Sequence, residues 1–193
     1  MKVIIIVAAV LAFTDAQIPS ETCPEVSVVQ NFSISEYAGV WYEQQKYPFI
    51  IEVLGRCNTA EYSLKPDGTI MVTNRQVGIL TGHPISVDGT VHLNSTSGEG
   101  KMIVNLFSGK VKYKLDVGKD VPYWILDTDY KTYTVVWSCR ELSIIGETLT
   151  AWILTRERNP PKEVIDKAIS VFENQNLSTT SLTKTDQQNC PQF

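Results

Sequence analysis

The sequence predicts an all-β domain of antiparallel strands, arranged as a sandwich or a barrel, with one helix near the carboxyl end. Three observations support this fold class. Eight short segments between residues 39 and 156 alternate apolar and polar side chains, as half-buried strands do. Turn-forming residues separate these segments, and most connections are short. After the eighth segment, the apolar spacing changes to that of an amphipathic helix.

The amino-terminal segment differs in composition from the rest of the chain. A lysine is followed by the apolar run 3–13 and by a short stretch that ends on the small residue Ala16, a pattern typical of a secretory signal peptide. The run is too short to span a bilayer. We therefore expect a signal peptide over residues 1–16 and one secreted, extracellular domain over residues 17–193.

The eight strand-like segments follow one another in the middle of the chain. Pro66, Asp67 and Gly68 form a hairpin signal between the second and the third. The alternation from Val111 to Val117 fits either a separate strand or the extension of a long hairpin, so residues 108–122 stay unassigned. The expected strands are Gly39–Lys46, Thr59–Leu64, Ile70–Val77, Ile85–Leu93, Lys101–Phe107, Tyr123–Asp127, Tyr133–Ser138 and Leu149–Arg156.

One helix is expected over about residues 160–174. Asn159 is a suitable N-cap, and the two prolines that follow suit a first turn, where a missing N–H costs nothing. We expect this helix to pack outside the sheet and a polar tail to follow over residues 175–193. Its apolar face consists of Val164, Ile165, Ala168, Ile169 and Phe172.

Charge and cysteine content limit the classes of function. The net charge of −4 argues weakly against nucleic acid and anionic membranes as partners. An even number of cysteines in a secreted chain predicts two disulfides, with three possible pairings. No CxxC spacing occurs, and no odd thiol is left for nucleophilic catalysis. The four cysteines are Cys23, Cys57, Cys139 and Cys190.

Few motifs suggest modification or chemistry. The sequons at Asn31, Asn94 and Asn176 are eligible for N-glycans in the secretory path, so we expect each of them at the surface. His83 and His92 lack the spacing of metal ligands. No metal ligand and no catalytic residue is therefore expected.

Three separated motifs resemble the signature of the lipocalin family. Gly39-Val40-Trp41 begins the first strand, Thr128-Asp129-Tyr130 lies between the sixth and the seventh, and Leu154-Thr155-Arg156 ends the eighth. The stretches NFSISEYAGVWYE, YWILDTDYKTY, AWILTRE and TDQQNCP extend the similarity over essentially the whole mature chain. Within the family they resemble most the group that includes apolipoprotein D and the insect bilin-binding proteins and insecticyanins.

This resemblance implies a specific fold. It implies an eight-stranded antiparallel up-and-down barrel with one C-terminal helix packed outside, and the disulfides Cys23–Cys139 and Cys57–Cys190. Trp41 can then close one end, with Arg156 stacked on its face in a cation–π contact worth roughly 0.5–2 kcal/mol. The residues expected to close the barrel are Gly39, Trp41, Thr128, Asp129, Tyr130 and Arg156.

Strand alternation from Trp41 onward predicts which side chains face the interior. This wall is mainly apolar with a few polar groups, as a ligand cavity requires, and it includes no lysine or arginine. Its members are Glu43, Gln45, Ala60, Tyr62, Leu64, Ile70, Val72, Asn74, Gln76, Val87, Gly89, Val91, Met102, Val104, Leu106, Tyr123, Ile125, Thr134, Val136, Thr150, Trp152 and Leu154.

Eleven residues are candidate ligand contacts, and core packing is the alternative role for each. Asn74 and Gln76 are the most diagnostic, because a buried amide without a partner costs roughly 1–3 kcal/mol. The candidates are Tyr37, Tyr62, Asn74, Gln76, Val91, Met102, Val104, Tyr123, Ile125, Val136 and Trp152.

The stretch YPFIIEVLG after the first strand is apolar without a clear period. In the lipocalin arrangement it connects the first two strands at the open end. We expect it to present apolar surface as a ligand portal, or as a docking patch for membranes or lipid particles. The alternative is that Phe49 and Leu54 fold inward and plug an empty barrel. The portal residues are Phe49, Ile50, Ile51, Val53 and Leu54.

The resemblance implies a secreted carrier of a small hydrophobic ligand, such as a fatty acid or a steroid-like lipid, that is not an enzyme and requires no cofactor. The alternative ligand is biliverdin, held as a bound chromophore; the expected lack of inward cations for its propionates favours lipid. A third hypothesis is a lipid- or partner-docking protein that acts through the open-end loops. We expect a monomer without a nucleic-acid partner.

Overall fold

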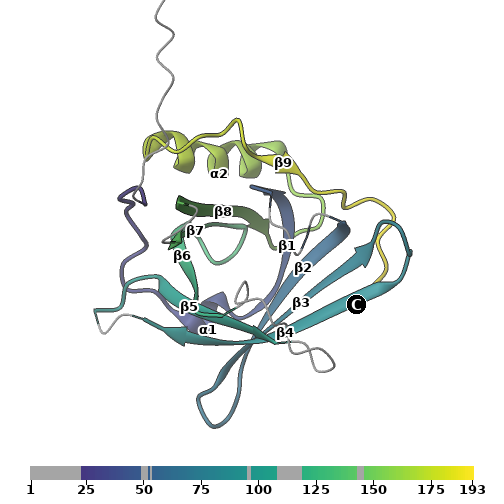
Figure 1. The fold of residues 1–193 in the computed structure, drawn as a ribbon, viewed down its shortest axis with the longest axis horizontal. Helices are drawn as coiled ribbons and strands as arrows, with labels where there is room; N and C mark the ends of the chain where they lie inside the picture. The colour runs from purple at the N-terminus through teal and green to yellow at the C-terminus, as the bar shows by residue number, and fades with distance from the viewer. Residues whose placement is uncertain (1–22, 49–51, 53, 95–96, 108–118, 143–145) are drawn as a thin grey trace, which may run out of the picture.

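The structure is a computed structural model that describes residues 23–48, 52, 54–94, 97–107, 119–142 and 146–193. Its strands close into a barrel, and a helix lies outside the wall (Figure 1). The elements are α1 (Ile34–Tyr37), β1 (Gly39–Lys46), β2 (Gly55–Leu64), β3 (Ile70–Gly78), β4 (Pro84–Leu93), β5 (Lys101–Phe107), β6 (Val121–Thr128), β7 (Tyr133–Leu142), β8 (Gly146–Thr155), α2 (Lys162–Asn174) and β9 (Thr183–Lys184).

The strand order confirms the predicted up-and-down barrel. Each strand from β1 to β8 pairs antiparallel with its neighbour in sequence, and β1 also pairs with β8, which closes the sheet on itself. A barrel of eight strands has an interior just wide enough for side chains or for one small ligand.

Two apolar clusters lie on opposite sides of the barrel wall. The inner cluster surrounds Trp41 and includes Met102 and Val136. The outer cluster includes Trp137 and is covered by Phe172 of α2, which packs on β6, β7 and β8. Because successive side chains of a strand point to opposite faces, β7 contributes Val136 to one cluster and Trp137 to the other. This double burial fixes the register of β7.

Several predicted element boundaries are wrong: β6 begins at Val121 rather than Tyr123, β7 continues to Leu142 rather than Ser138, and β8 begins at Gly146 rather than Leu149. The starts of β2 and α2 also differ. Strand β2 begins at Gly55 rather than Thr59, because a register shift and the positive φ of Cys57 interrupt the alternation near its start. The N-cap of α2 is Pro161, without a side-chain cap, rather than Asn159. A residue before a proline is driven towards extended backbone, so the chain stays extended through the two prolines.

Two short elements were not predicted. Helix α1 is a single turn in which the Ser33 Oγ accepts a hydrogen bond from the N–H of Glu36. Strand β9 pairs with β1 at Gln45 and Lys46. The sequence around β9 is polar, and its pairing depends on a strand distant in sequence.

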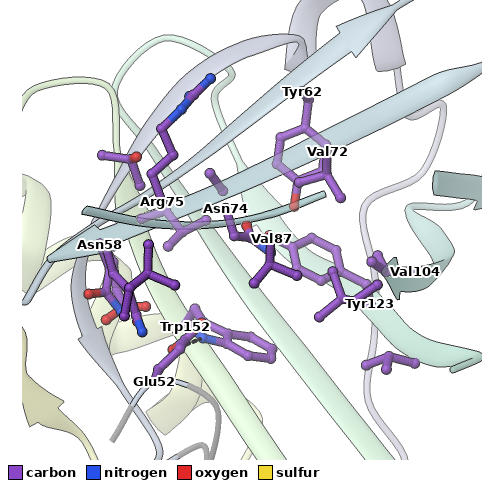
Figure 2. A pocket seen from close by; sticks show the side chains of 18 residues that line it. Glu52, Asn58, Tyr62, Val72, Asn74, Arg75, Val87, Val104, Tyr123 and Trp152 are labelled. Atoms are coloured by element: carbon purple, nitrogen blue, oxygen red, sulfur yellow. Dashed lines mark hydrogen bonds between the residues drawn. The ribbon is translucent and has the colours of Figure 1, made fainter. Parts of the chain in front are cut away.

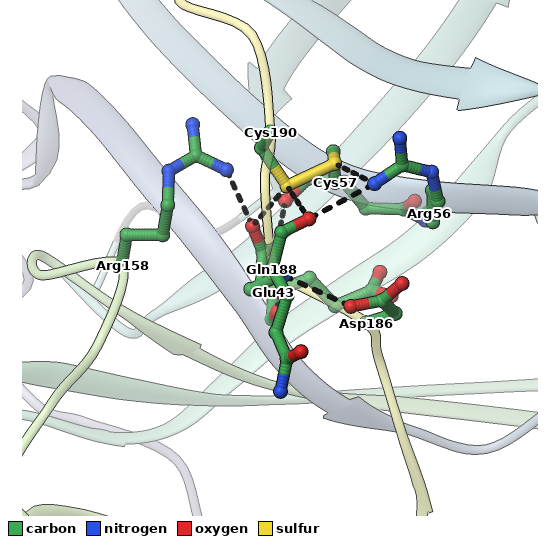
Figure 3. Close-up of a disulfide and its surroundings, with 9 residues drawn as sticks. Glu43, Arg56, Cys57, Arg158, Asp186, Gln188 and Cys190 are labelled. Carbon is green, nitrogen blue, oxygen red and sulfur yellow. Dashed lines mark hydrogen bonds between the residues drawn. A yellow bond between two sulfur atoms is a disulfide. The ribbon is translucent and has the colours of Figure 1, made fainter. Parts of the chain in front are cut away.

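Both disulfides have the pairing that the resemblance implied. Cys23–Cys139 ties the amino-terminal segment to β7, and Cys57–Cys190 ties the carboxyl-terminal tail to β2 (Figure 3). The buried Gln187 amide donates to the carbonyls of Glu43 in β1 and Asn58 in β2, each at 2.8 Å. The tail is therefore a strap that runs between the ends of β1 and β2 and hydrogen-bonds to both.

Candidate functional site

The floor of the barrel is closed by Arg156, which stacks on Trp41 with its guanidinium carbon 3.7 Å from the ring centroid. All three guanidinium nitrogens of Arg156 also donate hydrogen bonds of 2.9 to 3.1 Å. The acceptors are the backbone carbonyls of Glu36, Tyr37, Ala38, Val40 and Tyr130. Charge, ring contact and hydrogen bonds thus hold the plug together.

Gly39 is required at this floor for a steric reason. Its φ of +101° is unfavourable for other residues, and an added Cβ would lie 3.1 Å from the Nη1 of Arg156. Trp41 is fixed in turn by a 2.9 Å hydrogen bond from its Nε1 to the carbonyl of Tyr37.

Thr128 and Asp129 shape the turn that carries Tyr130. The Thr128 Oγ1 accepts from the N–H of Tyr130, and the Asp129 Oδ1 accepts from the N–H groups of Lys131, Thr132 and Tyr133. Partial burial alone would raise the pKa of Asp129. The hydrogen bonds from Thr132 and its neighbours outweigh this effect and hold the pKa below its ordinary value. These two residues hold the turn from which the Tyr130 carbonyl accepts a hydrogen bond from the Arg156 Nε.

A cavity of about 240 Å³ lies above this floor (Figure 2). Its deeper part is apolar and aromatic, with the rings of Tyr123 and Trp152 stacked at 5.9 Å between centroids. Burial raises the pKa values of Tyr62 and Tyr123 well above the ordinary value, so both phenols stay neutral. Of the eleven candidate contacts, six line the cavity: Tyr62, Asn74, Gln76, Val104, Tyr123 and Trp152.

The other five candidates do not line the cavity. They are buried in the inner apolar cluster that also contains Trp41. Burial raises the pKa of Tyr37 to about 12, and its hydroxyl lies 3.5 Å from that of Tyr123. The five are Tyr37, Val91, Met102, Ile125 and Val136.

One of the predicted inward side chains is placed wrongly, and a second is exposed. Leu64 lies opposite Ile70 and so keeps the inner face, but at the end of β2 it is 48% exposed. Gln45 takes the outer face because the register of β1 against β8 shifts between Glu43 and Gln45, so Lys46 lies opposite Trp152 and is buried instead. A bulge reverses the alternation after it. The expectation that no lysine faces inward fails for this reason.

Lys46 lies between two carboxylates near the mouth. Its Nζ is 2.9 Å from the Glu43 Oε1 and 3.1 Å from the Glu52 Oε2, which also accepts from the Trp152 Nε1 at 3.2 Å. The hydroxyl of Thr185, in the strap, donates to the Glu43 Oε1. Sequence reasoning missed Glu52 because no strand pattern places a connecting residue.

The two carboxylates and the lysine affect one another's protonation. Burial, and secondly the charge of Glu52, raise the pKa of Glu43 to about 8, against the weaker effect of Lys46. Burial disfavours the charged Lys46, but Glu52 and Glu43 together raise its pKa above the ordinary value. Lys46 is therefore a cation at neutral pH.

Asn58 was also missed, because the predicted strand began one residue later. It is 4% exposed and lines the cavity. Its Oδ1 has no hydrogen-bond partner within the described part of the chain. Such a buried acceptor requires an explanation, and the cavity beside it suggests a ligand or an ordered water.

The rim of the open end presents apolar side chains. Leu54 is 57% exposed, and its carbonyl accepts from the N–H of Ile79 at 2.8 Å. Ile79 and Leu80, in the turn between β3 and β4, are also exposed, Leu80 by 80%. The other expected portal residues, Phe49, Ile50, Ile51 and Val53, lie outside the described residues.

Groups suited to metal or thiol chemistry do not gather at the cavity. His83 and His92 are exposed on or beside β4, and all four cysteines are in disulfides. Over the described residues, no cluster of three or more histidine, cysteine, aspartate or glutamate side chains could hold a metal ion. No helix within these residues is long and apolar enough to cross a membrane.

Known proteins share both the sequence pattern and the fold. Residues 38–189 match the Lipocalin / cytosolic fatty-acid binding protein family. The chain is 36% identical to apolipoprotein D of Macaca fascicularis over 172 residues, which cover 89% of this chain and 85% of the relative. It is 32% identical to the bilin-binding protein of Pieris brassicae over 163 residues, 82% and 79% of the two chains. The structure of insecticyanin from Manduca sexta matches with a TM-score of 0.71 and 26% identity over 86% of each chain.

Proposed function

Because this chain belongs to the lipocalin family, we propose that it is a secreted carrier that binds a small hydrophobic ligand in the barrel and releases it through the open end. Residues 1–16 would be the signal peptide, and residues 17–193 would form one lipocalin domain. The observation that carries the proposal is a largely apolar cavity between the Arg156–Trp41 floor and an open mouth.

The expected affinity is moderate. Burying about 300 Å² of apolar ligand surface at about 25 cal/mol per Å² supplies a gross term of about 7 kcal/mol. After the cost of association, this corresponds to micromolar-class binding. No covalent step and no cofactor is required for such a function.

We favour a lipid, either a fatty acid or a steroid-like molecule, as the ligand class. The deeper part of the cavity is lined by Val72, Val104 and Leu154 together with aromatic rings, which suits a hydrocarbon chain or ring. The inward cation Lys46 already contacts Glu43 and Glu52. It is therefore poorly placed to pair with the propionates of biliverdin.

Biliverdin is the second ligand class. The aromatic wall of Tyr62, Tyr123 and Trp152 favours a conjugated ligand, and relatives named for bilin binding or called insecticyanin share the fold. Protein purified from its source would separate the two classes. A strong absorbance band in the red would identify a bilin, whereas solvent extraction and mass spectrometry would identify a lipid.

A cavity-filling variant tests the carrier proposal. Val104→Trp places a large ring in the cavity, and we expect it to weaken the binding of an apolar fluorescent probe at least tenfold. Thr90→Trp, on the outer face of β4, is the matched control and should retain affinity. Equal binding by both variants, or no binding by the native protein, would contradict a cavity carrier.

A docking role for the open end is a further candidate. The exposed Leu54, Ile79 and Leu80 favour contact with a lipid surface or a partner protein. If docking alone is the function, Leu54→Asp should abolish vesicle or partner binding and leave cavity affinity intact. In the carrier proposal, the same substitution should also shorten ligand retention.

We also propose N-glycans on the three sequons, since Asn31, Asn94 and Asn176 are all exposed. A monomeric state remains our expectation. Both are measured directly, by mass spectrometry after deglycosylation and by light scattering on the secreted protein.

A further inference from the structure

Charged hydrogen-bond donors are already paired in the half of the cavity nearest the mouth, whereas some acceptors are not paired within the described part of the chain. Glu43, Glu52 and Asn58 bring side-chain oxygens to this part of the lining. Figure 2 shows Glu52 and Asn58 on the same side of the cavity, near Trp152. We name this group, together with Lys46, the upper polar site.

The donors of the upper polar site are already used. An ammonium group has three N–H donors, and the Nζ of Lys46 has three acceptors: the Glu43 Oε1 at 2.9 Å, the Glu52 Oε2 at 3.1 Å and the Glu52 carbonyl at 3.4 Å. The single N–H donor of the Trp152 ring is directed to Glu52. These groups leave no charged donor for a ligand.

Arg75 does not supply a charged donor for a ligand either. Its Nη1 pairs with the Glu61 Oε2 at 2.6 Å. Figure 2 shows its guanidinium directed away from the other labelled side chains. The donors that remain in the lining are neutral: the Thr59 hydroxyl, which has no partner among the described residues, the Asn74 amide and the phenols deeper in the cavity.

Acceptors, in contrast, remain available. The Asn58 Oδ1 is buried with no partner among the residues that the structure describes. In the same residues, the second oxygen of Glu52 receives no hydrogen bond from the protein. A buried acceptor without a partner is destabilising, and a ligand donor would recover part of this cost.

From this imbalance we infer that the upper polar site receives an uncharged hydrogen-bond-donating head group, a hydroxyl or a primary amide, of an otherwise apolar ligand, and discriminates against a carboxylate. The inference rests on the proposed carrier function and narrows its ligand class. Among lipids it favours alcohols, hydroxylated sterol-like molecules and fatty amides over fatty acids.

Charge supports the same selectivity. A ligand carboxylate would be a third acidic group around one lysine, in a site where two charges of the same sign repel strongly. Protonation of Glu43 would add one neutral donor but no positive charge. An anion is therefore disfavoured in either protonation state of Glu43.

A matched ligand series tests the inference. Dodecanol, dodecanamide, dodecyl methyl ether and dodecanoate share one hydrocarbon chain and differ in the head group. Their affinities for the full-length secreted protein would be measured at neutral pH by displacement of an uncharged fluorescent probe. We expect dodecanol and dodecanamide to bind about tenfold more tightly than the ether, which lacks the donor, and than the carboxylate, which the acidic groups repel; tenfold corresponds to about 1.4 kcal/mol.

Asn58→Leu removes the buried acceptor while keeping similar volume. In this variant the affinity for dodecanol should exceed that for the ether by no more than about twofold. Val87→Ala, in the same lining, is the matched control: it should weaken all four ligands and keep their ranking. Circular dichroism would verify that both variants are folded. Glu52→Gln gives a second test, because it should improve dodecanoate relative to dodecanol.

The outcomes are distinguishable. Equal affinities for alcohol and ether would mean that water satisfies Asn58, and would overturn the inference while the carrier proposal stands. Tighter binding of dodecanoate would also overturn it. Failure of all four ligands, and of the probe, to bind would contradict the carrier proposal itself.

Discussion

The two ends of the barrel differ in how completely their polar groups are paired. At the closed end, Arg156 donates to five backbone carbonyls and stacks on Trp41. At the open end, Lys46 is fully used by two glutamates while the Asn58 acceptor has no described partner. Matched donors and acceptors stabilise a structure, whereas unmatched ones leave capacity for a ligand. The comparison therefore assigns stability to the floor and recognition to the mouth.

Removal of the plug should have the largest effect. Trp41→Ala would create a cavity in the fully buried floor and lower the free energy of unfolding by about 3–5 kcal/mol. Urea denaturation monitored by circular dichroism measures this loss. If the loss were below about 1 kcal/mol, the floor would not be the stabilising end.

Replacement of the arginine should have the next largest effect. Arg156→Lys keeps the charge but loses the planar fork of donors, and should cost about 2 kcal/mol. Arg158→Lys is the control, because Arg158 also lies over a ring, that of Tyr42, at 4.6 Å but outside the floor. Equal losses for the two variants would argue against a special role of Arg156.

The mouth should respond to pH where the floor does not. The pKa of Glu43 is raised from 4.5 to about 8, so the folded state binds the proton more tightly than the unfolded state. The free energy of unfolding should therefore decline as pH rises from about 4.5 to about 8. Glu43→Gln should remove about 1–2 kcal/mol of this decline, measured by denaturation across that range. Glu173→Gln, at an exposed position on α2, serves as the control and should leave the slope unchanged.

Substitution at the rim should barely alter stability. Leu80→Asp changes a side chain that is 80% exposed, so the free energy of unfolding should shift by less than about 0.5 kcal/mol. Its effect should appear as weaker association with neutral lipid vesicles in a flotation assay. A large loss of stability would show that the rim packs as core.

Strand alternation predicted an antiparallel sandwich or barrel, and the resemblance carried by three motifs predicted the closed barrel and its floor. The alternating segments and the three motifs placed Trp41 and Arg156 at one end, and the apolar spacing predicted the face of α2 with Phe172. These features depend on patterns that are local in sequence, so they are visible without a structure.

The polar half of the cavity could not be predicted in the same way. A single bulge in β1 places Lys46, instead of Gln45, on the inner face. The alternating pattern of the sequence does not reveal this bulge. Glu52 lies in a connection, and Asn58 follows the irregular start of β2. All three missed residues lie where the backbone departs from regular strand geometry, and recognition sites commonly occur at such positions.

Every acceptor of Arg156 is a main-chain oxygen. The seal therefore depends on the path of the backbone, and the side chains at Glu36, Ala38 and Val40 are free to diverge in evolution provided that Gly39 and Arg156 are kept. Because the floor does not depend on these side chains, residues at the mouth could change to bind other ligands while the barrel still folds.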